Sequence, residues 1–276
     1  MAVNDSILIV GQPDSGKTTF IAQFLTRVKK RKSSIKLIKT PENIKAITHA
    51  IKRLSMGEEP ITTPANENVE LVLPINVDGK NIDIVFPDYG GEQVNALIEL
   101  MEVNENWQKL VTYSDRWILF IRPHEITPEY DLSISSYDEI ETRKSTAFKS
   151  PGLSDQSKFI ELLQSLLYIK DKGVKNPISV PKLSIVLTCW DELNTNKKPV
   201  KVLREKLPMF LHFVETVWEK EAFEILGLSA QEFPLNSQEA KDKYQDELPE
   251  NFGYMIDQEG VKDTDITKLV KIALQL

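Results

Sequence analysis

The sequence predicts a three-layer α/β protein, with a mostly parallel sheet, one antiparallel hairpin strand and helices on both faces. Short apolar runs alternate along the chain with longer stretches in which apolar residues recur at helical spacing, and this alternation is typical of parallel sheets. The 276 residues are 41% hydrophobic and 27% charged, a composition that can bury a sizeable core. We therefore expect a single domain over 1–276.

The same patterns locate the individual elements. Apolar runs predict strands at 6–10, 69–77, 81–86, 116–121, 183–188 and 223–228. Apolar residues three and four positions apart predict helices at 17–31, 43–56, 92–111, 155–171, 199–220 and 264–275. Asp78-Gly79 favours a two-residue turn, so the second and third strands are expected to form the antiparallel hairpin. Two polar stretches, 122–154 and the acidic 231–263, interrupt the alternation and are expected to be long insertions.

The overall composition argues against several functions. The formal net charge of −7 does not indicate a nucleic-acid-binding protein. The single cysteine, Cys189, cannot form an internal disulfide and fits a reducing compartment. The first strand is predicted to begin within about five residues of Met1, which leaves no room for a signal peptide, and no apolar run approaches the ~20 residues of a membrane span. We expect a cytoplasmic protein with no membrane span and no nucleic-acid partner.

A basic run covers residues 27–39, which carry lysines and arginines and no acid. Cations at the end of the helix predicted at 17–31 complement the helix dipole, so a solvated helix end is the simpler interpretation. The alternative is a docking surface for an acidic partner or an anionic lipid.

The most informative feature is a G-x-x-x-x-G-K-[ST] pattern at residues 11–18, between a predicted strand and a predicted helix. In that context the glycines let successive backbone N–H groups turn towards phosphate oxygens, and the helix N-terminus adds partial positive charge. Lys17 is expected to bridge the outer phosphates, and Thr18 to bind Mg²⁺. The residues predicted to hold a nucleotide here are Gly11, Asp14, Ser15, Gly16, Lys17, Thr18 and Thr19.

Two further segments are expected on the phosphate side. The strand at 81–86 runs into a D-x-x-G pattern, in which Asp88 is predicted to hold Mg²⁺ and Gly91 to offer its backbone N–H to the γ-phosphate. A Gly-Gly turn capped by Asp88 is the alternative. A threonine between the first helix and the hairpin is expected to close over Mg²⁺ and the γ-phosphate; Thr63 is favoured, and Thr62 stays open.

The base side of the site is predicted from the ends of the last two strands, because ligands bind at the carboxyl ends of strands in open α/β sheets. Asp191, which follows Thr188 and Cys189, can accept two hydrogen bonds from guanine N1–H and N2–H₂, a pair that adenine lacks. An Asp that caps the next segment is the alternative. Ser229 and Ala230 are small enough to let a backbone N–H reach guanine O6.

These elements occur in order over residues 6–231, and with them the chain resembles P-loop GTPases of the translation-factor-related (TRAFAC-like) class. It more closely resembles the bacterial double-GTPase families of conflict and defence systems, through residues 86–92, 227–230 and the tail at 253–267. The resemblance implies the P-loop NTPase fold, hydrolysis of GTP to GDP and phosphate with Mg²⁺, and protein partners within one complex, such as another GTPase or an effector.

The chain departs from this pattern at two positions. Cys189 stands where such GTPases carry a lysine that stacks on the base. Glu92 stands where many carry a glutamine that orients water, and a carboxylate cannot donate a hydrogen bond to the γ-phosphate. We therefore expect slow intrinsic hydrolysis, with Lys17, Thr63, Gly91 and Glu92 as the catalytic set.

A potassium ion is a further candidate ligand. Some GTPases that resemble this loop carry Asn at the position of Asp14, where the side-chain oxygen holds a K⁺ that takes the place of an arginine finger. Asp14 keeps that oxygen and adds negative charge. The alternative is that Asp14 caps the helix start or pairs with Lys17.

Three functions stay open from the sequence. The favoured one is a GTP-binding switch whose hydrolysis depends on a partner. The second is a GTP-binding structural subunit that does not hydrolyse GTP, which the substitution at Glu92 would allow. The third and least favoured is an ATPase or P-loop kinase, for which Asp191 would give no base preference.

Overall fold

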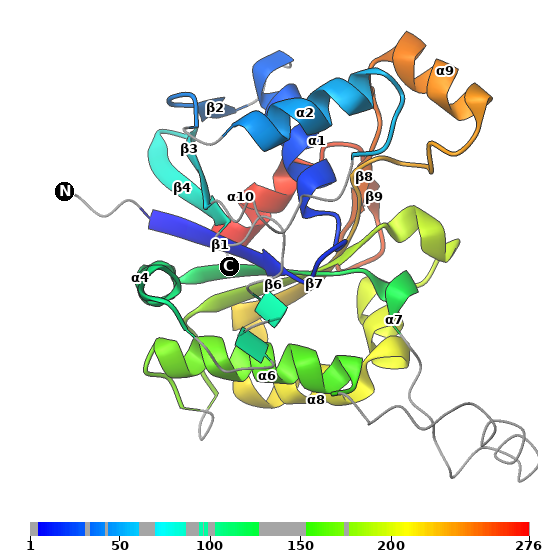
Figure 1. Ribbon diagram of the computed structural model, residues 1–276. Helices are drawn as coiled ribbons and strands as arrows, with labels where there is room; N and C mark the ends of the chain where they lie inside the picture. Colours follow the sequence, from blue (N-terminus) through cyan, green and yellow to red (C-terminus); the bar gives the residue numbers. More distant parts are fainter. Residues whose placement is uncertain are drawn as a thin grey trace, which may run out of the picture.

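One sheet with helices on both faces makes up the protein (Figure 1). The computed structural model describes residues 5–30, 34–41, 44–60, 70–86, 94–95, 97–98, 103–126, 153–173 and 177–275. The 9-stranded sheet has the order β2-β3-β4-β1-β5-β6-β7-β8-β9. Its strands are β1 (Asp5–Gly11), β2 (Ile35–Leu37), β3 (Leu71–Val77), β4 (Lys80–Phe86), β5 (Arg116–Ile121), β6 (Lys182–Thr188), β7 (Phe223–Ser229), β8 (Tyr254–Ile256) and β9 (Lys262–Asp263).

The helices lie in two layers, one on each side of the sheet (Figure 1). They are α1 (Lys17–Lys30), α2 (Lys45–Ser55), α4 (Glu105–Tyr113), α6 (Asp155–Ile169), α7 (Pro199–Lys206), α8 (Pro208–Val217), α9 (Gln238–Glu247) and α10 (Lys268–Gln275). Among the described residues, no helix is both long and apolar enough to cross a membrane.

Each face of the sheet has its own hydrophobic core, because successive side chains of a strand point to opposite faces. In β1, Ile7 and Ile9 pack into the core under α1, α2 and α10. Leu8 and Val10 pack into the core under α4, α6, α7 and α8. A strand buried on both faces reads as a continuous apolar run, which is why residues 6–10 predict this strand so clearly.

The central strands β4, β1, β5, β6 and β7 are parallel. The predicted hairpin is confirmed: β3 and β4 are antiparallel, and Asp78 and Gly79 both have positive φ (50° and 90°), as a tight hairpin turn requires. The expectation of one antiparallel strand is wrong, because β8 also runs against both of its neighbours. At 3 residues, β8 is too short to give a periodic signal.

Two predicted helices are interrupted. The prediction at 92–111 breaks before Asn104, whose side chain accepts a hydrogen bond from the backbone N–H of Trp107 (2.9 Å) and so begins α4. The prediction at 199–220 divides into α7 and α8 at Pro208, which lacks an N–H to continue a helix.

Regular structure also occurs where no clear pattern in the sequence predicts it. The stretch 231–263 contains α9, β8 and β9. Its polar composition hides α9, which buries only Tyr244. Most of the other predicted insertion, residues 127–152, lies outside the described residues.

A buried arginine joins α1 to the C-terminal part of the chain. Arg27 is 1% exposed, and its guanidinium donates to the backbone oxygens of Thr264 (2.6 Å), Phe252 (2.5 Å) and Gly253 (3.3 Å). Part of the basic run at 27–39 is therefore structural rather than a solvated helix end. Since α1 follows the glycine loop directly, this contact fixes the helix that carries the loop.

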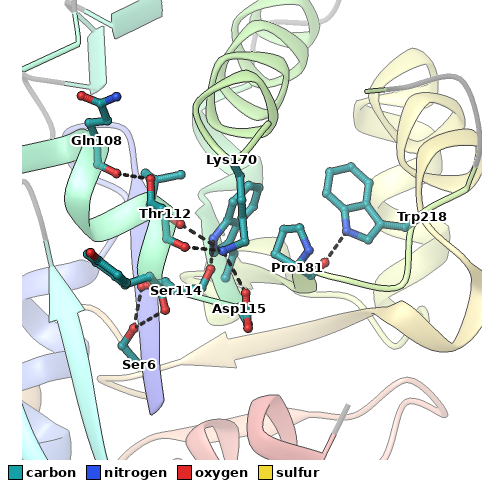
Figure 2. Close-up of polar contacts among 11 residues, drawn as sticks. Ser6, Gln108, Thr112, Ser114, Asp115, Lys170, Pro181 and Trp218 are labelled. Atoms are coloured by element: carbon teal, nitrogen blue, oxygen red, sulfur yellow. Dashed lines mark hydrogen bonds and ion pairs between the residues drawn. The ribbon is translucent and has the colours of Figure 1, made fainter. Parts of the chain in front are cut away.

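A second polar cluster lies around the start of β5 (Figure 2). Lys170 donates to the backbone oxygen of Thr112 (2.7 Å) and lies 2.8 Å from Asp115 Oδ1. The last carbonyls of a helix lack partners within it, so this lysine completes α4 and ties it to α6. Close by, Trp218 donates its indole N–H to the backbone oxygen of Pro181 (2.7 Å).

We predict that Arg27→Met destabilises the fold. The variant leaves buried carbonyl oxygens without a donor, which costs roughly 1–3 kcal/mol for each group, so the free energy of unfolding should fall by at least about 2 kcal/mol. Lys29→Met, an exposed cation on the same helix, is the matched control. Urea unfolding followed by circular dichroism measures both. Equal midpoints for the two variants would contradict a structural role for Arg27.

Candidate functional site

The candidate site lies at the edge where parallel strands end together. The chain places β4 on one side of β1 and β5, β6 and β7 on the other, and ligands bind where the strand order reverses in this way. The registers pair Gly11 with Phe120, Ile121 with Leu187, and Thr188 with Leu228. The carboxyl ends of four strands are therefore level at one edge.

A cavity of about 360 Å³ opens at this edge. The glycine loop and the start of α1 contribute Asp14, Ser15, Gly16, Lys17, Thr18 and Thr19 to its wall. The ends of β6 and β7 contribute Thr188, Cys189, Asp191, Glu192, Leu228, Ala230, Gln231 and Pro234. The remaining wall residues are Glu59, Pro60 and Arg122. Most of the residues predicted to hold a nucleotide thus lie around one cavity.

The glycines of the loop are needed for its shape. Gly16 has a φ of +81°, which L side chains rarely adopt. At Gly11, an added Cβ would lie 2.6 Å from Ser15 Oγ and 2.9 Å from the backbone oxygen of Phe120. Gly11 does not line the cavity; it lets the loop fold back closely against β5.

Lys17 is the first residue of α1 and is only 3% exposed. Its ammonium donates to the backbone oxygens of Gly11 (2.7 Å) and Gln12 (2.8 Å) and to Ser15 Oγ (3.3 Å). These contacts hold the positive charge against the loop while the side chain remains part of the cavity wall. A fixed cation beside the N-terminus of a helix favours bound anions.

Asp191 lies on the wall formed by the ends of β6 and β7. It accepts a hydrogen bond from the side chain of Ser229, whose Oγ in turn accepts from the backbone N–H of Glu232 (2.8 Å). Burial raises the pKa of Asp191, and the Ser229 hydroxyl opposes that rise. Ser229 is itself fully buried, so it positions Asp191 rather than lining the cavity.

The turn between β6 and Asp191 is held from two sides. Thr188 Oγ1 donates to the backbone oxygen of Ile121 (3.1 Å), which joins the ends of β6 and β5. Cys189 follows with φ 50° and ψ 43°, and burial raises the pKa of its thiol to about 12. Trp190 is buried in the core, where a Cβ on Gly227 would lie 2.7 Å from its ring.

Several predicted site residues lie outside the described residues. The described chain reaches Pro60 on one side and the end of β4 at Phe86 on the other. Glu59 and Pro60, the last described residues before Thr62 and Thr63, line the cavity. The roles of the following residues stay predictions: Thr62, Thr63, Asp88, Gly91 and Glu92.

The residues present suit a magnesium nucleotide. Mg²⁺ is usually held by one or two protein oxygens together with substrate phosphates. The Thr18 hydroxyl is such an oxygen on the cavity wall, one residue after Lys17. Among the described residues, no group of three or more His, Cys, Asp or Glu could hold a metal ion by itself.

The sequence did not single out one ion pair at the cavity. Arg122 follows β5 directly and pairs with Glu192, from Nε to Oε2 (3.0 Å) and from Nη2 to Oε1 (2.5 Å). The signal was available, since a charged residue at the carboxyl end of a strand is also what predicted Asp191. In the sequence, Arg122 is the first residue of the insertion expected at 122–154.

A glycine loop with a buried lysine, at the reversal point of a parallel sheet, defines a P-loop nucleotide-binding protein. The chain belongs to the Double-GTPase 1 family, which matches it over residues 8–273. The family match confirms the resemblance to double-GTPase families seen in the sequence. No curated protein matches it.

Solved structures similar to this chain include three GTPase-related proteins. The GTPase-like domain of S. cerevisiae Ski7, bound to GTP, has 15% identity and a TM-score of 0.46, over 83% of this chain and 43% of its own. Sup35 complexed with GDP has 14% identity and a TM-score of 0.37, over 82% of this chain and 37% of its own. The bacterial selenocysteine-specific elongation factor EF-Sec has 15% identity and a TM-score of 0.36, over 87% of this chain and 27% of its own. The chain spans less than half the length of each.

We predict that the Cys189 thiol reacts slowly in the folded protein. The thiolate is the reactive form, and a pKa raised to about 12 leaves little thiolate at neutral or mildly basic pH. Near about pH 8 the folded chain should react with Ellman's reagent at least roughly 100-fold more slowly than the chain unfolded in urea. With one cysteine in the chain, the absorbance change reports this residue alone. Equal rates would show that the thiol is not shielded.

Proposed function

We propose that this protein is a GTP-binding switch with slow, partner-dependent hydrolysis. The observation that carries the proposal is that Lys17 and Asp191 line one cavity, at the common carboxyl edge of the sheet. A fixed cation suits the phosphates and a partly buried carboxylate suits the guanine edge, and a cavity of about 360 Å³ is in the size range of small-molecule sites. Membership of a GTPase family supports the same conclusion.

In this proposal each end of the nucleotide is bound by residues with a distinct task. Lys17 and the N-terminus of α1 attract the phosphates. Asp191 accepts from guanine N1–H and N2–H₂, and the Ser229 hydroxyl keeps its carboxylate aimed. Bound Mg²⁺, with Thr18 as its protein ligand, would offset the negative charge of the phosphates. In this proposal the glycine loop binds the phosphates, and the ends of β6 and β7 bind the base.

Slow hydrolysis is proposed because of Glu92. A carboxylate at this position cannot donate to the γ-phosphate and adds charge that opposes it. A partner or a cation would then have to supply the missing stabilisation, and an arginine finger supplied by a partner is worth roughly 10³–10⁵ in rate. Loss of the γ-phosphate would release the segments that contain Thr63 and Gly91.

The proposal includes a cellular location and partners. Membership of the Double-GTPase 1 family and the resemblance to double-GTPases of defence systems support a cytoplasmic role in a multi-protein complex, beside another GTPase or an effector. A second candidate, favoured by Glu92, is a subunit that binds GTP without hydrolysing it. GTP turnover measured with and without the complex separates the two.

The proposed reading of guanine is tested by Asp191→Asn. The amide can donate to the extra oxygen of xanthine, so the variant should lose affinity for GDP and gain affinity for xanthosine diphosphate. Isothermal titration calorimetry with both nucleotides measures the change. An unchanged preference for GDP would contradict the role of Asp191.

The same carboxylate gives a pH dependence. A raised pKa means that Asp191 gains its proton at a higher pH than an ordinary Asp, and the protonated form no longer accepts both guanine hydrogen bonds. The affinity of the wild-type chain for GDP should therefore fall on acidification, and the affinity of Asp191→Asn for GDP should fall less. Parallel pH profiles for the two would exclude titration of Asp191 as the cause.

We also propose that K⁺ accelerates hydrolysis through Asp14. Asp14 lines the cavity with a φ of 57°, so its carboxylate is a candidate cation ligand beside the phosphates. GTPase rates, with the partner present, should be higher in KCl than in matched NaCl, and Asp14→Ala should remove the difference. Asp171→Ala, an exposed aspartate with φ 54° outside the cavity wall, is the control and should keep it. Identical rates in both salts would leave Asp14 a structural residue.

A further inference from the structure

The pair formed by Arg122 and Glu192 is the part of the cavity wall that the proposed function leaves unexplained. Both of its hydrogen bonds lie along one edge of the guanidinium, the edge that carries Nε and Nη2. The third nitrogen, Nη1, lies 3.8 Å from Glu125. Since Arg122 and Glu192 are only 27% and 20% exposed, the group is held in one orientation rather than moving freely in solvent.

The position of the guanidinium within the cavity is set by its neighbours. Glu192 belongs to the short 3-10 helix Trp190–Leu193, which begins directly after Cys189. Burial raises the pKa of both Cys189 and Asp191, and the positive charge of Arg122 opposes that rise by favouring their ionised forms. Arg122 therefore lies at the Asp191 end of the cavity, where the base is expected.

The way Arg122 is bound decides which part of it is left for a ligand. An arginine that holds a phosphate normally does so through a fork of N–H groups. Here the Nε–Nη2 fork is occupied by Glu192. The contacts with Glu192 and Glu125 are made by nitrogens in the plane of the guanidinium and do not involve its flat faces. Guanidinium planes stack well on aromatic rings and nucleobases.

The residue between Thr188 and Trp190 offers little surface to cover a base. Cys189 presents only a short side chain on this part of the wall. A purine whose edge is bound by Asp191 presents its flat surface to the residues beside Asp191. Resting on the proposed binding of GTP and GDP, we propose that Arg122 stacks on the guanine ring as its cover, with Glu192 as the residue that positions it.

The experiment compares ligands with and without a base. Isothermal titration calorimetry is carried out with GDP and with inorganic pyrophosphate, both with Mg²⁺, on the wild-type chain, Arg122→Ala, Arg122→Lys and Glu192→Gln. Arg204→Ala is the matched control, because Arg204 also pairs with a glutamate, Glu215 (3.3 Å), but lies outside the cavity wall. Thermal melting followed by circular dichroism establishes that each variant is folded.

Arg122→Ala should bind GDP about 5- to 100-fold more weakly than wild type, the range expected for one stacking contact, and should bind pyrophosphate equally well. Arg122→Lys keeps the charge but not the plane, so it should lose most of the same affinity. Glu192→Gln, which weakens the clamp, should lose part of it, and Arg204→Ala should match wild type.

Each other outcome overturns a distinct claim. Unchanged binding of GDP by Arg122→Ala would overturn the stacking role and leave the proposed function intact. Equal losses for GDP and pyrophosphate would show that Arg122 acts on the phosphates or on the fold. Full affinity in Arg122→Lys would show that charge alone is needed. Failure of the wild-type chain to bind GDP would overturn the proposed function and this inference with it.

Discussion

The candidate site depends on the register of β1, β5, β6 and β7. Parallel pairing brings Gly11, Ile121, Thr188 and Ser229 to one edge, although they lie far apart in the sequence. Each strand is followed at once by a polar segment that contributes to the cavity. A shift of one residue in any of these pairings would move each side chain of the strand to the opposite face of the sheet, and the packing of the two hydrophobic cores opposes such a shift.

The C-terminal part of the chain supports two sides of this cavity. Beyond the Arg27 contacts, Glu59 accepts a hydrogen bond from the backbone N–H of Leu235 (3.3 Å), and Gln245 donates to the backbone oxygen of Met56 (2.6 Å). Segment 56–60, which ends at the cavity wall, is thus attached to the region of α9. The same region reaches α1 through Gln23, which bonds Tyr244. A displacement of α9 would disturb both attachments, so the acidic stretch 231–263 contributes to the support of the cavity.

The sequence predicted those parts of the fold that local patterns determine. The buried strands and the Asp78-Gly79 hairpin followed from apolar runs and turn chemistry. Lys17 followed from the glycine-loop pattern at 11–18, and Asp191 from its place at a strand end. What it missed depends on contacts between distant segments. β8 is paired only because β7 and β9 lie on either side of it, and α9 has a polar sequence with a single buried residue. Arg122 gains its meaning only from Glu192, 70 residues away in the chain.

The central claim is a guanine-specific nucleotide site built from Lys17 and Asp191. The most direct measurement is calorimetric titration of the wild-type chain with GDP and with ADP, both with Mg²⁺, alongside Lys17→Ala checked for folding by circular dichroism. The account predicts that GDP binds more tightly than ADP by roughly 10⁴-fold, and that Lys17→Ala is folded but binds GDP far more weakly. Equal dissociation constants for GDP and ADP would contradict the account.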